Sequence, residues 1–187
     1  MLKNTDHQFG KVAIFIHWLS ALIIIGQFSF GLYMLSLDYY DPNYRILPHY
    51  HKSIGILFAI LLTFRLVWMK LNSRPGPASG ASKKEHLIGL KIQKLMLWLT
   101  VIVVILGYLI STAKGDSIRV FNWFEVPATI SNLGNQADWA AELHYWFAWL
   151  LIVTASLHGL AAIKHHFYDK DETLLRMLGK SKKTPKS

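Results

Sequence analysis

The sequence predicts an all-α integral membrane protein, a four-helix bundle with both termini in the cytoplasm. Three observations support this prediction. Four long apolar runs divide the 187 residues, and each is close to the roughly 20 residues that an α-helix needs to cross a bilayer. The composition is 52% hydrophobic with a mean hydropathy of +0.29, which is high for a soluble domain. Positive charge also collects in alternate connections, as it does in the cytoplasmic loops of membrane proteins.

A soluble bundle of four buried helices is the alternative, and the same runs count against it. Helices of a soluble bundle carry a polar stripe along one side, whereas these runs show almost none. The chain also has no cysteine. This excludes disulfides, thiolate metal sites and covalent c-type haem attachment, which requires Cys-x-x-Cys-His.

We predict one domain over residues 1–187, and its spans follow in chain order. The first span is apolar apart from His17, Gln27 and three serines. The second is short and takes residues from its flanks, and the third and fourth are nearly continuous. A connection rich in Pro, Gly and Ser is expected to be flexible, a longer aromatic loop is expected to cover the outer mouth of the bundle, and a basic tail is expected to be disordered. These segments are the spans 12–37, 51–70, 91–111 and 139–164, the flexible connection 72–84, the aromatic loop 112–138 and the tail 180–187.

The charges of the connections predict the orientation. The termini and the middle connection hold most of the lysines and arginines, whereas the other two loops offer only four, placed beside several acidic residues. The formal net charge of +9 therefore marks membrane topology, and a nucleic-acid partner is not expected. The four cationic residues of the outer loops are Arg45, Lys52, Lys114 and Arg119.

Four histidines fall at two depths of the predicted spans. His144 and His158 are fourteen residues apart, so they lie about 21 Å apart along one helix and point the same way after nearly four turns. His17 follows the cytoplasmic edge by six residues, which matches the depth of His158. His51 opens the second span from the outer side, at the level of His144. The depths therefore predict an inner pair, His17 with His158, and an outer pair, His51 with His144.

Paired neutral imidazoles that face each other across a bundle are what bis-histidine haem ligation requires. One histidine alone is equally well explained by helix packing, with its ring satisfied by nearby carbonyls or hydroxyls. Two level pairs favour haem. A metal-ion or small-solute transporter would also use membrane histidines, but it would normally add intramembrane carboxylates, and only Glu142 near the outer edge offers one. A non-redox membrane scaffold is the third class that the sequence allows.

Further positions are candidates to contact a cofactor. Gly55 lies one turn after His51, and Gly31 lies fourteen residues after His17, where a porphyrin could approach the first helix. Arg65 lies fourteen residues after His51 and could pair with a haem propionate at the inner level. The alternatives are helix-packing glycines and an arginine that snorkels to the cytoplasmic edge. His165, two turns after His158, is the reserve inner ligand.

Five stretches of the chain resemble the bacterial dihaem cytochrome b561 family. They are Phe15-Ile-His17-Trp18, His51-Lys-Ser-Ile-Gly55, Arg65-Leu-Val-Trp68, Leu143-His144-Tyr-Trp and His158-Gly-Leu-Ala-Ala-Ile-Lys-His165-His166-Phe. The resemblance covers about residues 7–180 and implies an inner-membrane protein with two haem b groups, held by His17, His51, His144 and His158 in the pairs given above. Some members carry a histidine early in the third span, where this chain has Gln93.

The resemblance also implies a function. It predicts electron transport across the inner membrane between the quinone pool, with ubiquinone as the quinone, and a reactant in the periplasm. Superoxide is one such reactant, because the related family activity is superoxide oxidation with electrons passed to ubiquinone. A periplasmic redox protein or lipid-binding protein that meets the aromatic loop is the other partner that we consider.

Overall fold

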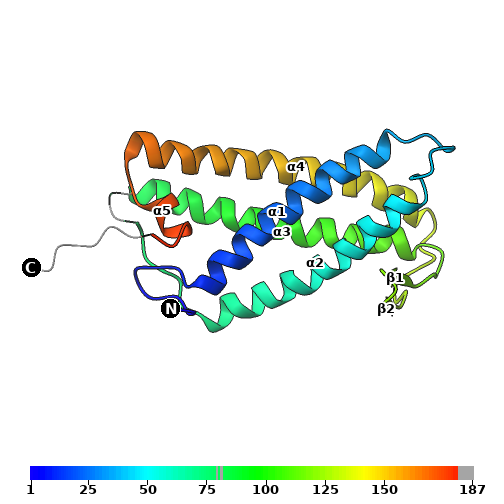
Figure 1. Ribbon diagram of the computed structural model, residues 1–187, viewed down its shortest axis with the longest axis horizontal. Helices are drawn as coiled ribbons and strands as arrows, with labels where there is room; N and C mark the ends of the chain where they lie inside the picture. Colours follow the sequence, from blue (N-terminus) through cyan, green and yellow to red (C-terminus); the bar gives the residue numbers. More distant parts are fainter. Residues whose placement is uncertain (79, 81, 181–187) are drawn as a thin grey trace, which may run out of the picture.

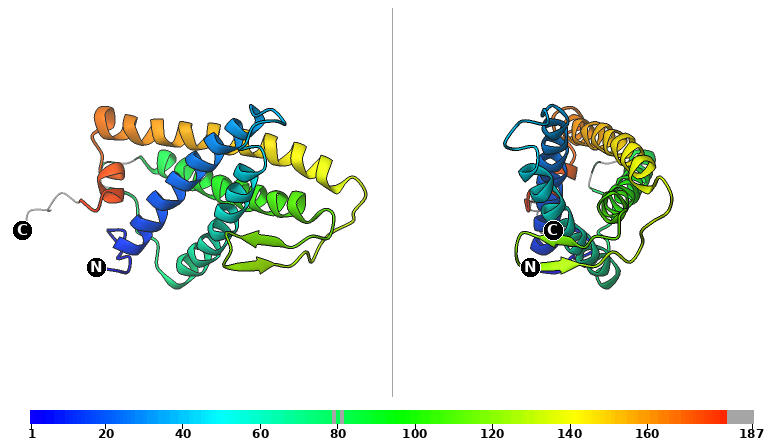
Figure 2. Two further views of the ribbon diagram at one scale, coloured as in Figure 1. Left: turned by 45° about the vertical axis from the view of Figure 1, so that its right-hand side comes forward. Right: turned by 90° about the vertical axis from the view of Figure 1, so that its right-hand side faces the viewer.

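The computed structural model describes residues 1–78, 80 and 82–180. The basic tail that we predicted at 180–187 therefore lies outside the described residues, apart from Lys180. Four long helices lie side by side along the molecule (Figures 1 and 2). They are α1 (Lys11–Leu35), α2 (Ile46–Leu71), α3 (Lys83–Thr112) and α4 (Gln136–Lys164). All four are long and apolar enough to cross a membrane, which confirms the predicted all-α, four-helix membrane architecture.

The helices extend beyond the apolar spans, mainly at their N-terminal ends. α2 begins at Ile46, before the predicted start at 51, and α3 begins at Lys83, before the predicted start at 91. The reason at α3 is a capping motif, because the Ser82 hydroxyl accepts the N–H of Glu85 at 3.5 Å and Glu85 stands in the first turn. A Ser-x-x-Glu sequence of this kind stabilises a helix start in polar surroundings. The apolar run thus marks the membrane-facing part of each helix and not its full length.

The tightest core lies between α3 and α4, near the end of the bundle that holds the long loop. Leu106, Leu109 and Ala140 are buried there, and Phe147 packs against them. Elsewhere in the four helices, large apolar side chains such as Leu22 and Leu157 are exposed on the outside of the bundle. A helix that is apolar on all sides while its outer face is uncovered is typical of a membrane span.

The two ends of the bundle are built differently. The N-terminus, the α2–α3 connection and the C-terminal helix α5 (Thr173–Met177) lie at one end, and a small hairpin lies at the other (Figure 1). This arrangement follows from four consecutive spans, which return the chain to the side where it began. We refer to the hairpin end as the outer end and to the terminal end as the inner end.

The hairpin was not predicted. Its strands β1 (Ile118–Val120) and β2 (Phe124–Val126) pair antiparallel, with Arg119 opposite Glu125. The hairpin is attached to α2 through Ser53, which is fully buried: the Phe121 amide donates to the Ser53 hydroxyl at 2.9 Å, and this hydroxyl donates to the His49 carbonyl at 2.8 Å. As expected from its aromatic character, the long loop packs against the bundle.

A buried glutamine joins the same loop to α3 and α4. Gln136 is 1% exposed, and its amide nitrogen donates to the Leu109 carbonyl at 2.8 Å and to the Ile130 carbonyl at 3.4 Å. Its amide oxygen accepts the N–H of Leu133 at 3.2 Å. Leu109 belongs to the last turn of α3, whose carbonyls have no partner within the helix. Gln136, at the start of α4, therefore satisfies a free carbonyl at the end of α3.

The inner end is closed by contacts between distant parts of the chain. Arg176 of α5 is buried and donates to the Gly76 carbonyl at 3.0 Å, while the Trp18 indole donates to the Met177 carbonyl at 2.8 Å. Burial lowers the pKa of Arg176. The Gly76 amide in turn donates to the Asp6 carbonyl at 2.9 Å. The middle connection, predicted to be flexible, is thus held by both the N-terminal segment and the C-terminal helix at its described residues.

Candidate functional site

His51 and His144 face each other near the outer end of the bundle. They come from α2 and α4, and their ring centroids are 6.3 Å apart with the ring planes 76° from parallel. An imidazole nitrogen binds a transition metal at about 2 Å, so two imidazoles on opposite sides of one metal centre place their ring centroids about 6 Å apart. The sequence placed these two histidines at one depth, and the structure brings their rings to this separation.

A cavity surrounds this histidine pair. It contains about 800 Å³ of empty space, part of which is open to the surface. Both histidines line it, together with apolar side chains and small residues of all four helices, among them Gly55, Gly107, Ala148 and Ile24. An apolar cavity of this kind suits a flat, largely apolar group.

The two rings of the outer pair are held differently. The Nδ1 atom of His144 lies 2.9 Å from the Val103 carbonyl of α3. A carbonyl can only accept, so this nitrogen carries the proton and Nε2 of the neutral ring keeps its lone pair. The Nδ1 atom of His51 is buried and has no hydrogen-bond partner among the described residues. Both rings therefore offer a nitrogen that is not engaged by protein.

Two of the predicted glycines lie beside the outer pair. A Cβ atom at Gly31 would lie 3.7 Å from Cε1 of His51. A Cβ atom at Gly55 would lie 3.7 Å from the side-chain nitrogen of Gln27, which donates to the His51 carbonyl at 2.9 Å. A methyl group at Gly31 would thus be in ordinary van der Waals contact with the His51 ring on the α1 side, and Gly55 lines the cavity on the α2 side.

The inner residues His17, His158 and Arg65 come from α1, α4 and α2. All three are half-buried, and Arg65 and His158 lie in the neighbourhood of His17. The three residues thus lie in one region of the bundle, and their roles as an inner ligand pair and a cofactor contact stay predictions.

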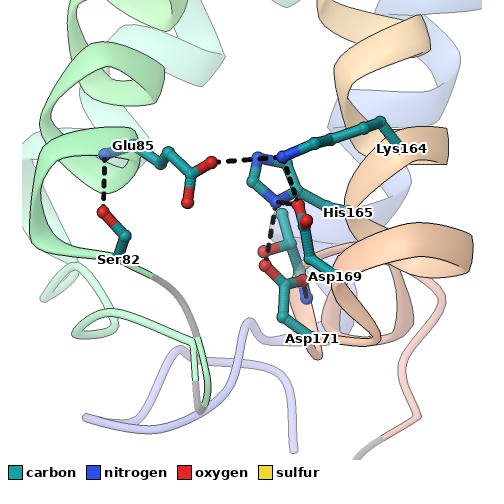
Figure 3. Close-up of polar contacts among 7 residues, drawn as sticks. Ser82, Glu85, Lys164, His165, Asp169 and Asp171 are labelled. Atoms are coloured by element: carbon teal, nitrogen blue, oxygen red, sulfur yellow. Dashed lines mark hydrogen bonds and ion pairs between the residues drawn. The ribbon is translucent and has the colours of Figure 1, made fainter.

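His165, the reserve inner ligand, faces other groups. It begins the single π-helical turn η1 (His165–Asp169) that follows α4. Its Nδ1 atom lies 2.8 Å from a carboxylate oxygen of Asp169 and 3.0 Å from one of Asp171 (Figure 3). The Lys164 ammonium lies within 3.2 Å of Glu85 and 2.7 Å of Asp169, so a lysine already balances these carboxylates. His158 is the better match to His17.

Sequence reasoning missed Val103, Gly107 and Gln27. The Val103 contribution is a backbone carbonyl, which no side-chain pattern reveals. Gly107 and Gln27 did leave a signal, since a glycine and an amide within apolar spans are positions where close approach or hydrogen bonding is expected. Gln93, the departure from the family pattern, is exposed on α3 and accepts a hydrogen bond from Arg74 of the middle connection.

One of the four lysines and arginines of the outer loops is paired with a carboxylate, so the outer surface has less unpaired positive charge than the sequence indicates. Arg119 lies 3.2 Å from Glu125, and both side chains are about half exposed. Hydrogen bonds from Ser117 and Arg119 lower the pKa of Glu125, so the carboxylate stays charged and keeps its partner. Attraction of an anion to this face would therefore depend more on Lys52 and Lys114.

Four membrane-spanning helices with facing histidines around an apolar cavity are the arrangement expected of a membrane cytochrome of the b type. The comparisons with known proteins agree. This chain belongs to the prokaryotic cytochrome b561 family, whose model matches residues 8–180. The family implies haem b and electron transport, and the four spans make the protein a multi-pass protein of the bacterial plasma membrane.

Three relatives match over nearly their full lengths. Cytochrome b561 homolog 2 of Escherichia coli (strain K12) is 48% identical over 179 residues, which covers 95% of each protein. A Yersinia pestis protein named "Probable superoxide oxidase CybB" is 29% identical over 178 residues, covering 94% of this chain and 98% of that protein. Cytochrome b561 homolog 1 of Escherichia coli is 24% identical over 185 residues, covering 94% and 99%.

Proposed function

We propose that this protein is a dihaem b-type cytochrome that carries electrons between the membrane quinone pool and a reactant in the periplasm. The observation that carries the proposal is the outer pair: the His51 and His144 rings are 6.3 Å apart across an apolar cavity. In this proposal these two histidines would hold the outer haem. His17 and His158 are the ligands of the inner haem. Family membership makes a metal-ion or small-solute transporter the weaker alternative.

The protein residues have defined tasks in this proposal. Each histidine donates one ring nitrogen to iron, and a bound haem supplies the one-electron chemistry. Arg65 stabilises a propionate at the inner level by a charge-assisted hydrogen bond. Gly31 and Gly55 leave space for the porphyrin between α1 and α2. The apolar side chains around the outer pair exclude water, which favours electron transfer over side reactions.

We further propose that the inner end, with both termini, faces the cytoplasm. The chain has no native cysteine, so single cysteines report topology cleanly. We expect Asn122→Cys, in the exposed turn of the hairpin, to react with a membrane-impermeant maleimide on the periplasmic side. Ser73→Cys, in the exposed middle connection, should react only after the membrane is permeabilised. The reverse pattern would overturn this orientation.

Superoxide is the outer reactant that we propose, with ubiquinone as the membrane acceptor. The support is the name of the Yersinia pestis relative. In vesicles that contain ubiquinone, superoxide supplied from outside should reduce the haems within the mixing time and then produce ubiquinol. Vesicles that carry His51→Ala should show at least a tenfold slower reduction, because the outer haem is missing. If superoxide leaves the wild-type haems oxidised, a periplasmic redox or lipid-binding protein becomes the preferred partner.

A further inference from the structure

The His144 ring lies directly against the backbone of α3. Its Nδ1 atom is 2.9 Å from the Val103 carbonyl. A Cβ atom placed on Gly107 would lie 3.3 Å from Cε1 and 3.5 Å from Nδ1 of the same ring. The distance of 3.3 Å to Cε1 is shorter than an ordinary van der Waals contact, so an added methyl group would press on the imidazole.

Helix geometry explains why this contact needs a glycine. In an α-helix the carbonyl of residue 103 accepts the N–H of residue 107, and one lone pair of the carbonyl remains. A side chain on a helix covers the turn on the N-terminal side of its own Cα. The side chain of residue 107 would therefore cover the approach to carbonyl 103. Glycine leaves this approach open, and the His144 N–H uses it.

We propose that Gly107 is a positioning residue for the outer haem. It admits the His144 ring to the Val103 carbonyl, which places the ring proton on Nδ1 and leaves Nε2 for the iron. The inference rests on the proposed function, in which His144 and His51 are the outer ligands. No sequence motif pointed to Gly107, and its role follows from the distances around the ring.

The bond to Val103 also changes the chemistry of the ligand. A hydrogen bond from the far nitrogen makes an imidazole a stronger electron donor, and a stronger donor favours the oxidised metal. His51 has no such partner among the described residues. His144 is thus the ligand through which the protein backbone lowers the potential of the outer haem, and weakening the bond should raise that potential.

The test is Gly107→Ala, with Gly89→Ala as the matched control. Both glycines lie within α3, and a Cβ atom at Gly89 meets nothing within 4 Å. Both variants gain the same helix propensity, so a difference between them reports the contact with His144. Redox titration with optical detection, together with electron paramagnetic resonance of the oxidised protein, follows each haem separately.

We expect Gly107→Ala to move one midpoint potential to a more positive value and to change the low-spin signal of that haem. The affected haem should be the one that His144→Ala removes. The Gly107→Leu variant should bind no haem at the outer site, and the Gly89→Ala variant should have the midpoint potentials of the wild type. Two unchanged potentials in Gly107→Ala, or a shift confined to the haem that His158→Ala removes, would overturn the proposal.

The outcomes separate this inference from the proposed function. If the wild-type protein binds no haem, or if His144→Ala retains two, the proposed function fails first. If His144→Ala loses one haem while Gly107→Ala is unchanged, only the role of Gly107 fails. Should Gly107→Ala not accumulate, pulsed electron–nuclear spectroscopy of the wild type tests the hydrogen bond from His144 to Val103, on which the proposed role of Gly107 depends. One outer ligand must then show a slowly exchanging Nδ1 proton, and rapid exchange on both outer ligands contradicts the proposal.

Discussion

Replacing His144 with alanine should halve the haem content of the purified protein, from two groups per chain to one. The reason is the facing arrangement with His51, at 6.3 Å between ring centroids, because an alanine would remove one of the two residues that would hold the outer haem and would enlarge the cavity. His51→Ala should give the same result. The measurement is the ratio of haem to protein by the pyridine haemochrome method, with a redox titration to show that one of two steps has disappeared.

The chain provides a close control for this experiment. His49 is two residues from His51 on α2 and is also half-buried, but its ring lies 6.4 Å from that of Phe121 in the outer loop. We expect His49→Ala to retain both haems. His17→Ala and His158→Ala should each remove the other haem and leave the outer one. A ligand variant of either pair that keeps both haems would contradict the pairing.

Replacing Gln136 with leucine should lower the free energy of unfolding by about 2–4 kcal/mol, because a buried and a partly buried backbone group lose their partners, at about 1–3 kcal/mol for the first and about 1 kcal/mol for the second. These groups are the Leu109 carbonyl and the Leu133 amide, at 2.8 and 3.2 Å from the Gln136 side chain. Leucine is similar in size to glutamine, so the lower free energy of unfolding reports lost hydrogen bonds more than lost packing. Denaturant titration in detergent, followed by haem absorbance and by circular dichroism, measures the effect.

Asn135→Ala is the matched control for Gln136→Leu. Asn135 precedes α4, is exposed, and makes no side-chain capping bond, so its replacement should change stability by less than about 0.5 kcal/mol. If Gln136→Leu is as stable as the control, Gln136 does not join α3, the loop and α4 in the way described. A loss of stability without loss of haem at low denaturant would show that the junction supports the fold and not the cofactor directly.

The sequence contained enough information to predict the four spans and to place His51 and His144 at one depth. Both follow from strong, averaged signals: long apolar runs set the spans, and flanking charges such as Lys11 and Lys164 set the depths. The ends of the helices were harder to predict. The start of α3 depends on the cap at Ser82, which lies in the polar connection outside the apolar run.

The hairpin and the contacts around His144 could not be predicted for a different reason. Strands of three residues have little intrinsic stability, and this hairpin depends on the buried hydroxyl of Ser53 on helix α2. The Val103 carbonyl carries no sequence signal, and Gly107 resembles any packing glycine until the position of His144 is known. Local patterns describe single elements, whereas these contacts depend on how two elements meet.

One consequence of the shared helix α4 concerns membrane voltage. His144 and His158 are fourteen residues apart on this helix, about 21 Å along its axis within a hydrocarbon core about 30 Å thick. An electron that passes between the two proposed haems would therefore cross about two-thirds of the transmembrane field. Moving one elementary charge across the whole membrane changes its free energy by about 2.3 kcal/mol per 100 mV. The transfer of one electron between the two proposed haems would therefore change its free energy by about 1.6 kcal/mol per 100 mV. With the cytoplasm negative, the membrane potential opposes inward electron flow and favours outward flow. The size of the membrane potential would therefore control how readily this protein passes electrons to the inner side.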